Sequence, residues 1–229
     1  MTVLSDNEKK AMYKLQWKKM NEPMTGAALR WHAISKILKQ RPKVFLDIGV
    51  GGFYSEAWVV KETDPNCKII GFEPHPDRFQ LIKQYGYPGQ LRQFVISNTD
   101  QKIKGYMGCD GGKSDFRLFG EDEPDYAYQE IEIQSYKLDS LELPSNSFND
   151  IFLWADVEGG ELSVLQSAER LFNENKIIGL NLEVRDITNP SATRCTSFQV
   201  IEFLKTKHFF AFQDKGSGKR DILFLREDN

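Results

Sequence analysis

Cysteine is scarce in this sequence, and its few positions exclude two common ways of stabilising a chain. The 229 residues contain three cysteines, Cys67, Cys109 and Cys195. An odd number at wide spacings fits neither a disulfide framework nor a zinc-binding cluster. The pattern is typical of a reducing compartment, and we therefore expect a cytoplasmic protein.

Long apolar runs and an excess of one charge are missing too. No run approaches the ~18–20 apolar residues that a membrane-spanning helix needs. Residues 1–19 are lysine-rich and lack the apolar centre of a signal peptide. The 30 basic and 33 acidic residues give a net charge of −3, without the basic excess typical of nucleic-acid-binding proteins. We expect neither a membrane nor a nucleic-acid partner.

A glycine-rich turn is the most informative feature that is present. The sequence Asp47-Ile48-Gly49-Val50-Gly51-Gly52 directly follows the apolar run 44–46. A second apolar run, at 69–72, ends in Glu73, 26 residues after Asp47. Two strands that each end in an acid, joined by a glycine-rich turn and a helix, are typical of a nucleotide-binding βαβ unit. Glycines let a ligand approach the backbone closely, and Glu73 is placed to accept both hydroxyls of a ribose.

The acid at position 47 favours one nucleotide ligand over another. Nicotinamide cofactors present a pyrophosphate to bare backbone N–H groups, and an acid on the last turn of the strand would repel that anion. S-adenosylmethionine has no phosphate and carries a cationic amino group and a sulfonium. Asp47 therefore predicts a methyltransferase that uses S-adenosylmethionine.

Alternating strands and helices are expected from residue 43 onward. Strands are expected at 44–48, 68–73, 91–97, 103–107, 130–136, 150–156, 177–184, 209–214 and 221–226, and helices at 54–62, 76–85, 161–172 and 198–206. The alternation at 130–136 favours an edge strand. We expect 108–125 to be a long irregular loop of functional or mobile character. The last two strands flank a glycine-containing turn, as in a β-hairpin.

Two helices are expected ahead of the sheet, one beginning near Ser5 and ending before Pro23, the other at 25–40. We divide the chain into an N-terminal helical cap, 1–41, and a Rossmann-like domain, 42–229. The cap either lies over the carboxyl edge of the sheet, where it would shape a substrate pocket, or covers an open sheet edge. The sequence leaves both possibilities open.

A second motif, Asp156-Val157-Glu158-Gly159-Gly160-Glu161, closes the fourth expected core strand. Ligands of open α/β sheets bind where the strand order reverses, between the first and fourth strands, so Asp47 and Asp156 should face one crevice. With Glu73-Pro74-His75-Pro76 and the pair Leu182-Glu183, these motifs occur in the order found in the FkbM-type methyltransferases, which residues 43–185 resemble.

The resemblance implies a class I, Rossmann-like methyltransferase fold: a mostly parallel seven-stranded sheet with a C-terminal antiparallel hairpin and N-terminal helices. It also implies roles for particular residues. Asp47 and the turn would hold the methionine end of S-adenosylmethionine, Glu73 the ribose, Pro74 and His75 the side of the adenine, and Ser97 and Asn98 its edge. The cofactor-binding set is Asp47, Gly49, Gly51, Gly52, Tyr54, Glu73, Pro74, Ser97, Asn98 and Asp156.

Asp156 and Glu158 are the expected catalytic residues. Methyl transfer from a sulfonium is an in-line displacement, which gains rate from alignment, and a hydroxyl acceptor also needs a base. Glu158 is the first choice of base, because crowding by Asp156 raises the pKa of one carboxyl of the pair. The same pair could bind a divalent cation, although we predict no metal site. By family resemblance the acceptor is a hydroxyl on a sugar, a glycan or another small metabolite.

Two other functions stay open on the sequence. One is an NAD(P)-linked oxidoreductase, against which Asp47 and the C-terminal hairpin argue. The other is a non-catalytic module that binds S-adenosylmethionine, against which Asp156 and Glu158 argue. Oligomeric state is not indicated by any pattern in the chain.

Overall fold

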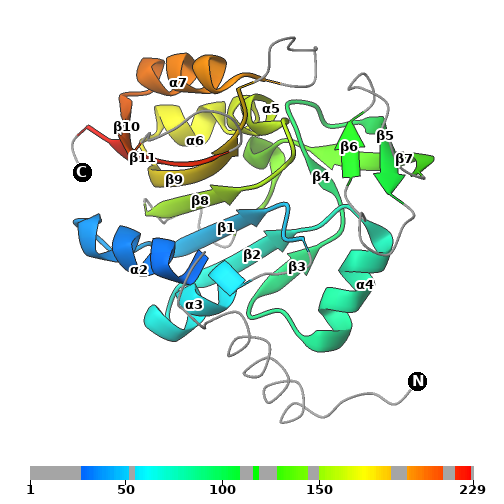
Figure 1. Ribbon diagram of the computed structural model, residues 1–229, viewed down its shortest axis with the longest axis horizontal. Coiled ribbons are helices and arrows are strands. Elements are labelled where there is room, and N and C mark those ends of the chain that lie inside the picture. The colour runs from blue at the N-terminus through cyan, green and yellow to red at the C-terminus, as the bar shows by residue number, and fades with distance from the viewer. Residues whose placement is uncertain are drawn as a thin grey trace.

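A seven-stranded sheet forms the centre of the protein (Figure 1). The structure is a computed structural model that describes residues 27–51, 55–108, 116–118, 128–143, 150–186, 195–213 and 220–227. The strand order is β10-β11-β9-β8-β1-β2-β3. The bounds of these strands are β1 Val44–Ile48, β2 Lys68–Phe72, β3 Gln90–Arg92, β8 Ile151–Ala155, β9 Ile177–Val184, β10 Phe209–Gln213 and β11 Arg220–Arg226.

Strand direction in this sheet confirms the predicted fold class. The pairs β3–β2, β2–β1, β1–β8 and β8–β9 are all parallel. Strand β11 runs antiparallel to both β9 and β10 and forms the C-terminal hairpin. The chain reverses its direction of winding between β1 and β8, and ligands of open α/β sheets bind at such a point.

Helices cover both faces of the sheet. They are α2 Ala27–Ile37, α3 Ser55–Thr63, α4 Pro76–Tyr85, α5 Glu161–Gln166, α6 Glu169–Asn173 and α7 Ser197–Thr206, with a short 3-10 turn η1 at Leu138–Ser140. Figure 1 shows α2 and α3 on one side of the sheet and α5, α6 and α7 on the other. Because both faces are covered, β1 and β8 are buried along their whole length, and apart from Asp47 all their residues are apolar. No helix in the described ranges is long and apolar enough to cross a membrane.

Helix α2 packs on the face of the sheet rather than along an edge. Trp31 and Ile34 of α2, with Leu38 just after it, share one apolar cluster with Phe45 of β1 and Phe152 of β8. Trp31 is 0% exposed, and its ring meets those of Phe45 and Phe152 edge-on at centroid distances of 5.3 and 5.1 Å. The expected first helix lies outside the described residues, and the boundary at 41/42 stays a prediction.

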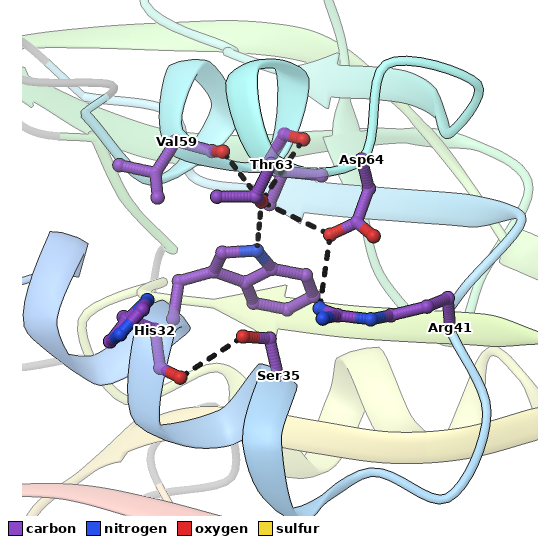
Figure 2. Close-up of polar contacts among 8 residues, drawn as sticks. His32, Ser35, Arg41, Val59, Thr63 and Asp64 are labelled. Carbon is purple, nitrogen blue, oxygen red and sulfur yellow. Dashed lines mark hydrogen bonds and ion pairs between the residues drawn. The ribbon is translucent and has the colours of Figure 1, made fainter.

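Hydrogen bonds join α2 to the end of α3 (Figure 2). The indole Nε1–H of Trp31 donates to Oγ1 of Thr63 at 3.0 Å. The Thr63 hydroxyl donates to the Val59 carbonyl at 2.8 Å, and Nη1 of Arg41 donates to the carboxylate of Asp64 at 3.5 Å. The bond to Thr63 gives the buried indole N–H of Trp31 an acceptor, without which burial would cost it its hydrogen bond to water.

A second, smaller sheet corrects three expectations. Its order is β4-β7-β5-β6, with bounds β4 Val95–Ile96, β5 Lys102–Gly108, β6 Phe116–Leu118 and β7 Tyr128–Tyr136. The expected strand 91–97 is split, since β3 belongs to the central sheet and β4 to the smaller one. Strand β7 lies between β4 and β5 and is therefore not an edge strand. Within 108–125, which we expected to be irregular, β6 pairs with β5.

Two tertiary contacts explain where local pattern was misleading. Between β3 and β4, the Phe94 ring packs against Phe72 of the large sheet and Tyr136 of the small one, at 5.5 and 4.7 Å. The helix expected at 161–172 is broken into α5 and α6 at Ser167. The Ser167 carbonyl accepts the N–H of Asp139 and its hydroxyl accepts that of Leu138, so η1 docks on the break.

The packing of Trp31 predicts a large stability difference between two aromatic truncations. Trp31→Ala should lower the free energy of unfolding by roughly 3–5 kcal/mol, because it empties a buried aromatic site. Phe198→Ala on α7 is the control, since Phe198 is 68% exposed and should change stability by no more than about 0.5 kcal/mol. Urea denaturation of both variants checks this, and equal losses would contradict the burial of α2.

Candidate active site

The glycine turn after β1 brings the ends of β1 and β8 into contact. Gly49 and Gly51 have positive φ values of 80° and 64°, a region that side-chain-bearing residues rarely adopt. A Cβ on Gly49 would also collide with the carbonyl oxygen of Asp156. The N–H of Asp156 donates to the Ile48 carbonyl at 3.0 Å, which continues the pairing beyond the strand ends.

A cavity opens at these strand ends. It collects residues from the turn after β1, the end of β2, the first turn of α4, the stretch before and within β4, and the turn after β8. Its lining is Ile48, Gly49, Gly51, Phe72, Glu73, Pro74, Arg78, Phe94, Val95, Ile96, Asp156, Val157, Glu158 and Gly160. Six of the predicted site residues therefore share one cavity: Gly49, Gly51, Glu73, Pro74, Asp156 and Glu158.

The Glu73 carboxylate is held by backbone donors from both sides. It is 4% exposed, its Oε2 accepts the N–H of Gly51 at 2.8 Å, and its Oε1 accepts the N–H of His75 at 2.8 Å. Burial raises the pKa of this carboxyl, and the two N–H groups together with the charge of Arg78 oppose that rise. Each oxygen retains a lone pair for a further donor.

His75 does not line the cavity but links two elements beside it. Its Nδ1 accepts the N–H groups of Asp77 and Arg78 at 3.2 and 3.5 Å and so caps α4. Its Nε2 lies 3.1 Å from the Gly108 carbonyl at the end of β5, to which it donates. The ring thereby ties α4 to the smaller sheet.

Asp47 lies near the end of β1, two residues before the first glycine of the turn, and is 1% exposed. Its Oδ2 accepts the phenolic O–H of Tyr87 at 2.8 Å, while its Oδ1 has no hydrogen-bond partner among the described residues. Burial raises the pKa of Asp47 to about 7; the Tyr87 bond opposes this, and the charges of Glu73 and Asp156 add to it. The acid therefore changes charge near neutral pH, directly under the turn.

Three carboxylates lie close together at the carboxyl ends of β8 and β9. One oxygen from each of Asp156, Glu158 and Glu183 lies within 4.8 Å of the others, a spacing that could hold a metal ion. The guanidinium of Arg185 forms an ion pair with Glu158. Glu158 has a positive φ of 55°, which for a residue other than glycine signals local strain and often marks a functional turn.

Glu161 fixes the shape of that turn. It is buried, its Oε1 accepts the N–H of Gly159 at 3.1 Å, and the Cys195 thiol donates to its Oε2 at 3.5 Å. The N–H of Cys195 in turn donates to the Gly159 carbonyl at 2.9 Å. Two residues further along, the N–H of Ser197 donates to the carbonyl of Arg185 at 3.1 Å. The start of α7 is thereby pinned to the carboxyl ends of β8 and β9.

Arg30 brings α2 to the same end of the sheet. Its guanidinium pairs with Asp221 of β11 and lies 5.7 Å from the ring centre of Trp154. Burial lowers the pKa of Arg30, while the charges of Glu56, Glu183 and Asp156 act in the other direction. Part of the predicted cap thus reaches the carboxylates at the mouth of the cavity.

Two predicted adenine contacts, Ser97 and Asn98, are not among the residues that line this cavity. Ser97 is buried, and its hydroxyl bonds with those of Ser135 and Thr99 at the joint between β4 and β7. Asn98 donates to Gln166 of α5 at 3.0 Å. The cavity is lined instead by the three residues before them, Phe94, Val95 and Ile96. Gly52 and Tyr54 lie outside the described residues.

Arg78, Tyr87 and Arg185 escaped the sequence-based assignment. Only Arg78 carried a signal, because a basic residue in the first turn of a helix opposes the helix dipole and so suggests another reason for its presence. Tyr87 follows the end of α4 and reaches Asp47 only through the fold.

The strand order and the strand-end cavity define the class of Rossmann-like methyltransferases. Residues 44–213 match the family described as the methyltransferase FkbM domain. The chain therefore belongs to this family, and it is a methyltransferase. No curated protein sequence matches the chain significantly.

Solved structures of methyltransferases resemble this one at low sequence identity. A TehB-like S-adenosylmethionine-dependent methyltransferase from Corynebacterium glutamicum shares 10% identity over 97% of this chain and 100% of its own, with a TM-score of 0.46. The Burkholderia thailandensis 1,6-didemethyltoxoflavin-N1-methyltransferase shares 12% identity over 99% of this chain and 92% of its own, with a TM-score of 0.43. The N-terminal domain of human METTL16 shares 12% identity over 89% of this chain and 71% of its own, with a TM-score of 0.47.

The contact between β1 and β8 predicts opposite outcomes for two glycine-to-alanine changes. Gly49→Ala should cost at least about 2 kcal/mol of stability, because it combines a positive φ with a backbone collision. Gly160→Ala is the matched control, since a Cβ there would lie an ordinary 3.6 Å from Val157. Calorimetric melting of both variants measures this, and a Gly49→Ala protein as stable as the control would refute the close approach.

The buried acid beneath the turn predicts a pH-dependent effect of Asp47→Asn. A raised pKa means that the folded state holds the proton more tightly than the unfolded state. The unfolding free energy of the wild type should therefore fall as pH rises from about 4 to about 7. Because an asparagine side chain cannot ionise, the free energy of unfolding of the variant should rise relative to that of the wild type over this range, by up to roughly 4 kcal/mol. Urea titrations across the range test it; a constant difference would contradict it.

Proposed function

We propose that the protein transfers the methyl group of S-adenosylmethionine to a hydroxyl of a sugar or another small polyhydroxylated metabolite. The observation that carries the proposal is that Asp156 and Glu158 line the same cavity as Glu73 and the glycine turn. Groups that can accept a proton thus adjoin the groups expected to hold the cofactor.

The residues present fit the cofactor. Gly49 and Gly51 leave a cradle with no Cβ on the backbone that faces the cavity. Glu73 has a free lone pair on each oxygen, one for each ribose hydroxyl, and the apolar side chains of Phe94 and Ile96 line the same space. When bound, S-adenosylmethionine supplies an electrophilic methyl group on a positively charged sulfur.

Glu158 is proposed as the residue that receives the proton of the acceptor hydroxyl. Its position is fixed twice, by the ion pair with Arg185 and by the left-handed turn that Gly159 and Glu161 support. A carboxylate held in one geometry orients the hydroxyl as well as accepting its proton, and alignment contributes much of the rate in a displacement.

The density of polar groups around Glu158 supports a polyhydroxylated acceptor. Asp156 and Glu183 stand beside it, and Arg185 adds guanidinium donors. Carboxylates accept hydrogen bonds from hydroxyls, and guanidinium groups donate to hydroxyl oxygens. An acceptor with several neighbouring hydroxyls can use both kinds of group.

A divalent cation is the second candidate at this cluster, because Asp156, Glu158 and Glu183 have suitable spacing. We propose a metal-free site, since the Arg185 ion pair already supplies positive charge to Glu158. Turnover should then be unchanged by a chelator, and loss of turnover that Mg²⁺ or Mn²⁺ restores would favour the cation.

Calorimetric titration separates cofactor binding from the alternative nucleotide ligand. The wild type should bind S-adenosylhomocysteine and not NAD. Glu73→Ala should abolish this binding, because it removes the acceptor for both ribose hydroxyls. Unchanged affinity in the Glu73 variant would overturn the assignment of the pocket.

Glu158→Gln should behave in the opposite way. It should keep the affinity for S-adenosylhomocysteine while transfer of radiolabelled methyl groups to a panel of sugars and glycosides falls by about 10²–10⁴-fold. Glu169→Gln on the exposed side of α6 is the control and should lose nothing. Full turnover by Glu158→Gln would exclude it as the base, and turnover with amines alone would overturn the hydroxyl acceptor.

A further inference from the structure

Arg78 enters the cofactor cavity from the first turn of α4. It lines the same cavity as Glu73 and Gly51, and a Cβ on Gly51 would lie 3.5 Å from its Nη1. The N–H of Arg78 donates to Nδ1 of His75, the cap of the same helix. Since Glu73 stands five positions earlier, one short segment delivers both the buried acid and a guanidinium to the glycine turn.

Glu73 can serve a ribose only as a carboxylate. Its two oxygens already accept the N–H groups of Gly51 and His75, which leaves one lone pair on each oxygen for two hydroxyl donors. A protonated carboxyl would carry an O–H where a donor must approach. One of the four hydrogen bonds would then be lost.

Burial disfavours the charge of Glu73, and Asp47 and Glu73 repel one another when both are ionised. Asp47 lies on β1, and Asp156 and Glu158 lie after β8. Arg92 on β3 directs its guanidinium to Gln90 and to the Glu142 carbonyl. The His75 ring bonds with the Gly108 carbonyl and the Asp77 N–H and does not line the cavity. Within the described part of the cavity lining, Arg78 is therefore the charge that offsets a group of acids.

We infer that Arg78 is a positioning residue of the cofactor site, whose guanidinium keeps the buried Glu73 carboxylate ionised and in place for the two ribose hydroxyls. The inference rests on the proposed role of Glu73 in cofactor binding. Arg78 acts through Glu73 by charge, so a lysine should replace it and a neutral side chain of similar length should not.

The test is calorimetric titration of S-adenosylhomocysteine into wild type, Arg78→Met and Arg78→Lys at about pH 6 and about pH 8. The ratio of variant to wild-type Kd cancels every titration that the proteins share. For Arg78→Met this ratio should be about tenfold larger at the lower pH, because loss of the guanidinium charge raises the pKa of Glu73 further and so favours its protonated form. Arg78→Lys should show nearly the same ratio at both pH values.

Lys83→Met is the matched control, because it removes the same charge from the same helix at an exposed position. It should leave the Kd unchanged at both pH values. A loss in Arg78→Met that is equal at both pH values would overturn the inference and indicate a direct contact instead; an unchanged Kd would overturn it as well. Failure of the wild type to bind S-adenosylhomocysteine would instead contradict the proposed function itself.

Discussion

The site depends on the close approach of the carboxyl ends of strands β1 and β8. Gly49 can lie against the carbonyl of Asp156 only because it has no side chain, and its positive φ turns the chain away from the sheet at once. This one contact sets the floor of the cavity. It places the turn expected to hold the cofactor beside the carboxylates expected to act on the acceptor.

Three buried carboxyl groups surround that floor, and they are stabilised to different degrees. Glu73 accepts two backbone N–H groups, and Glu161 accepts one N–H and a thiol, so each is fixed by its own turn. Asp47 has a single donor, the Tyr87 hydroxyl, and one oxygen without a partner among the described residues. An unsatisfied buried acid is costly. We therefore regard Asp47 as the acid whose charge depends most on what occupies the site.

The sequence was sufficient where local chemistry and burial agree. Strands β1, β8 and β9 are mostly apolar because strands inside the sheet are covered on both faces, and α4 begins at a proline and ends before Gly86. The acids and glycines at strand ends followed from the same reasoning, since the carboxyl ends of parallel strands meet.

It failed where distant segments decide the structure. The two-residue strand β4 exists only by pairing with β7, some forty positions away, and α5 ends because Ser167 bonds with η1. Neither has a local signal. Ser97 and Asn98, the predicted adenine contacts, directly follow the cavity-lining residues, and where the chain crosses from one sheet to the other the Ser97 hydroxyl bonds with that of Ser135. Which side chains face a cavity at such a crossing depends on the partner strand.

The bonds that pin the start of α7 have a consequence for how this protein can change. Arg185 is joined to Ser197, and Gly159 to Cys195, so the chain leaves the carboxyl edge of the sheet near residue 186 and returns to it at residue 195. Both anchors are fixed by the core, whatever connects them. Insertions and deletions between them would leave the strand-end carboxylates where they are. The length of this connection can therefore change without moving the groups at the ends of β8 and β9.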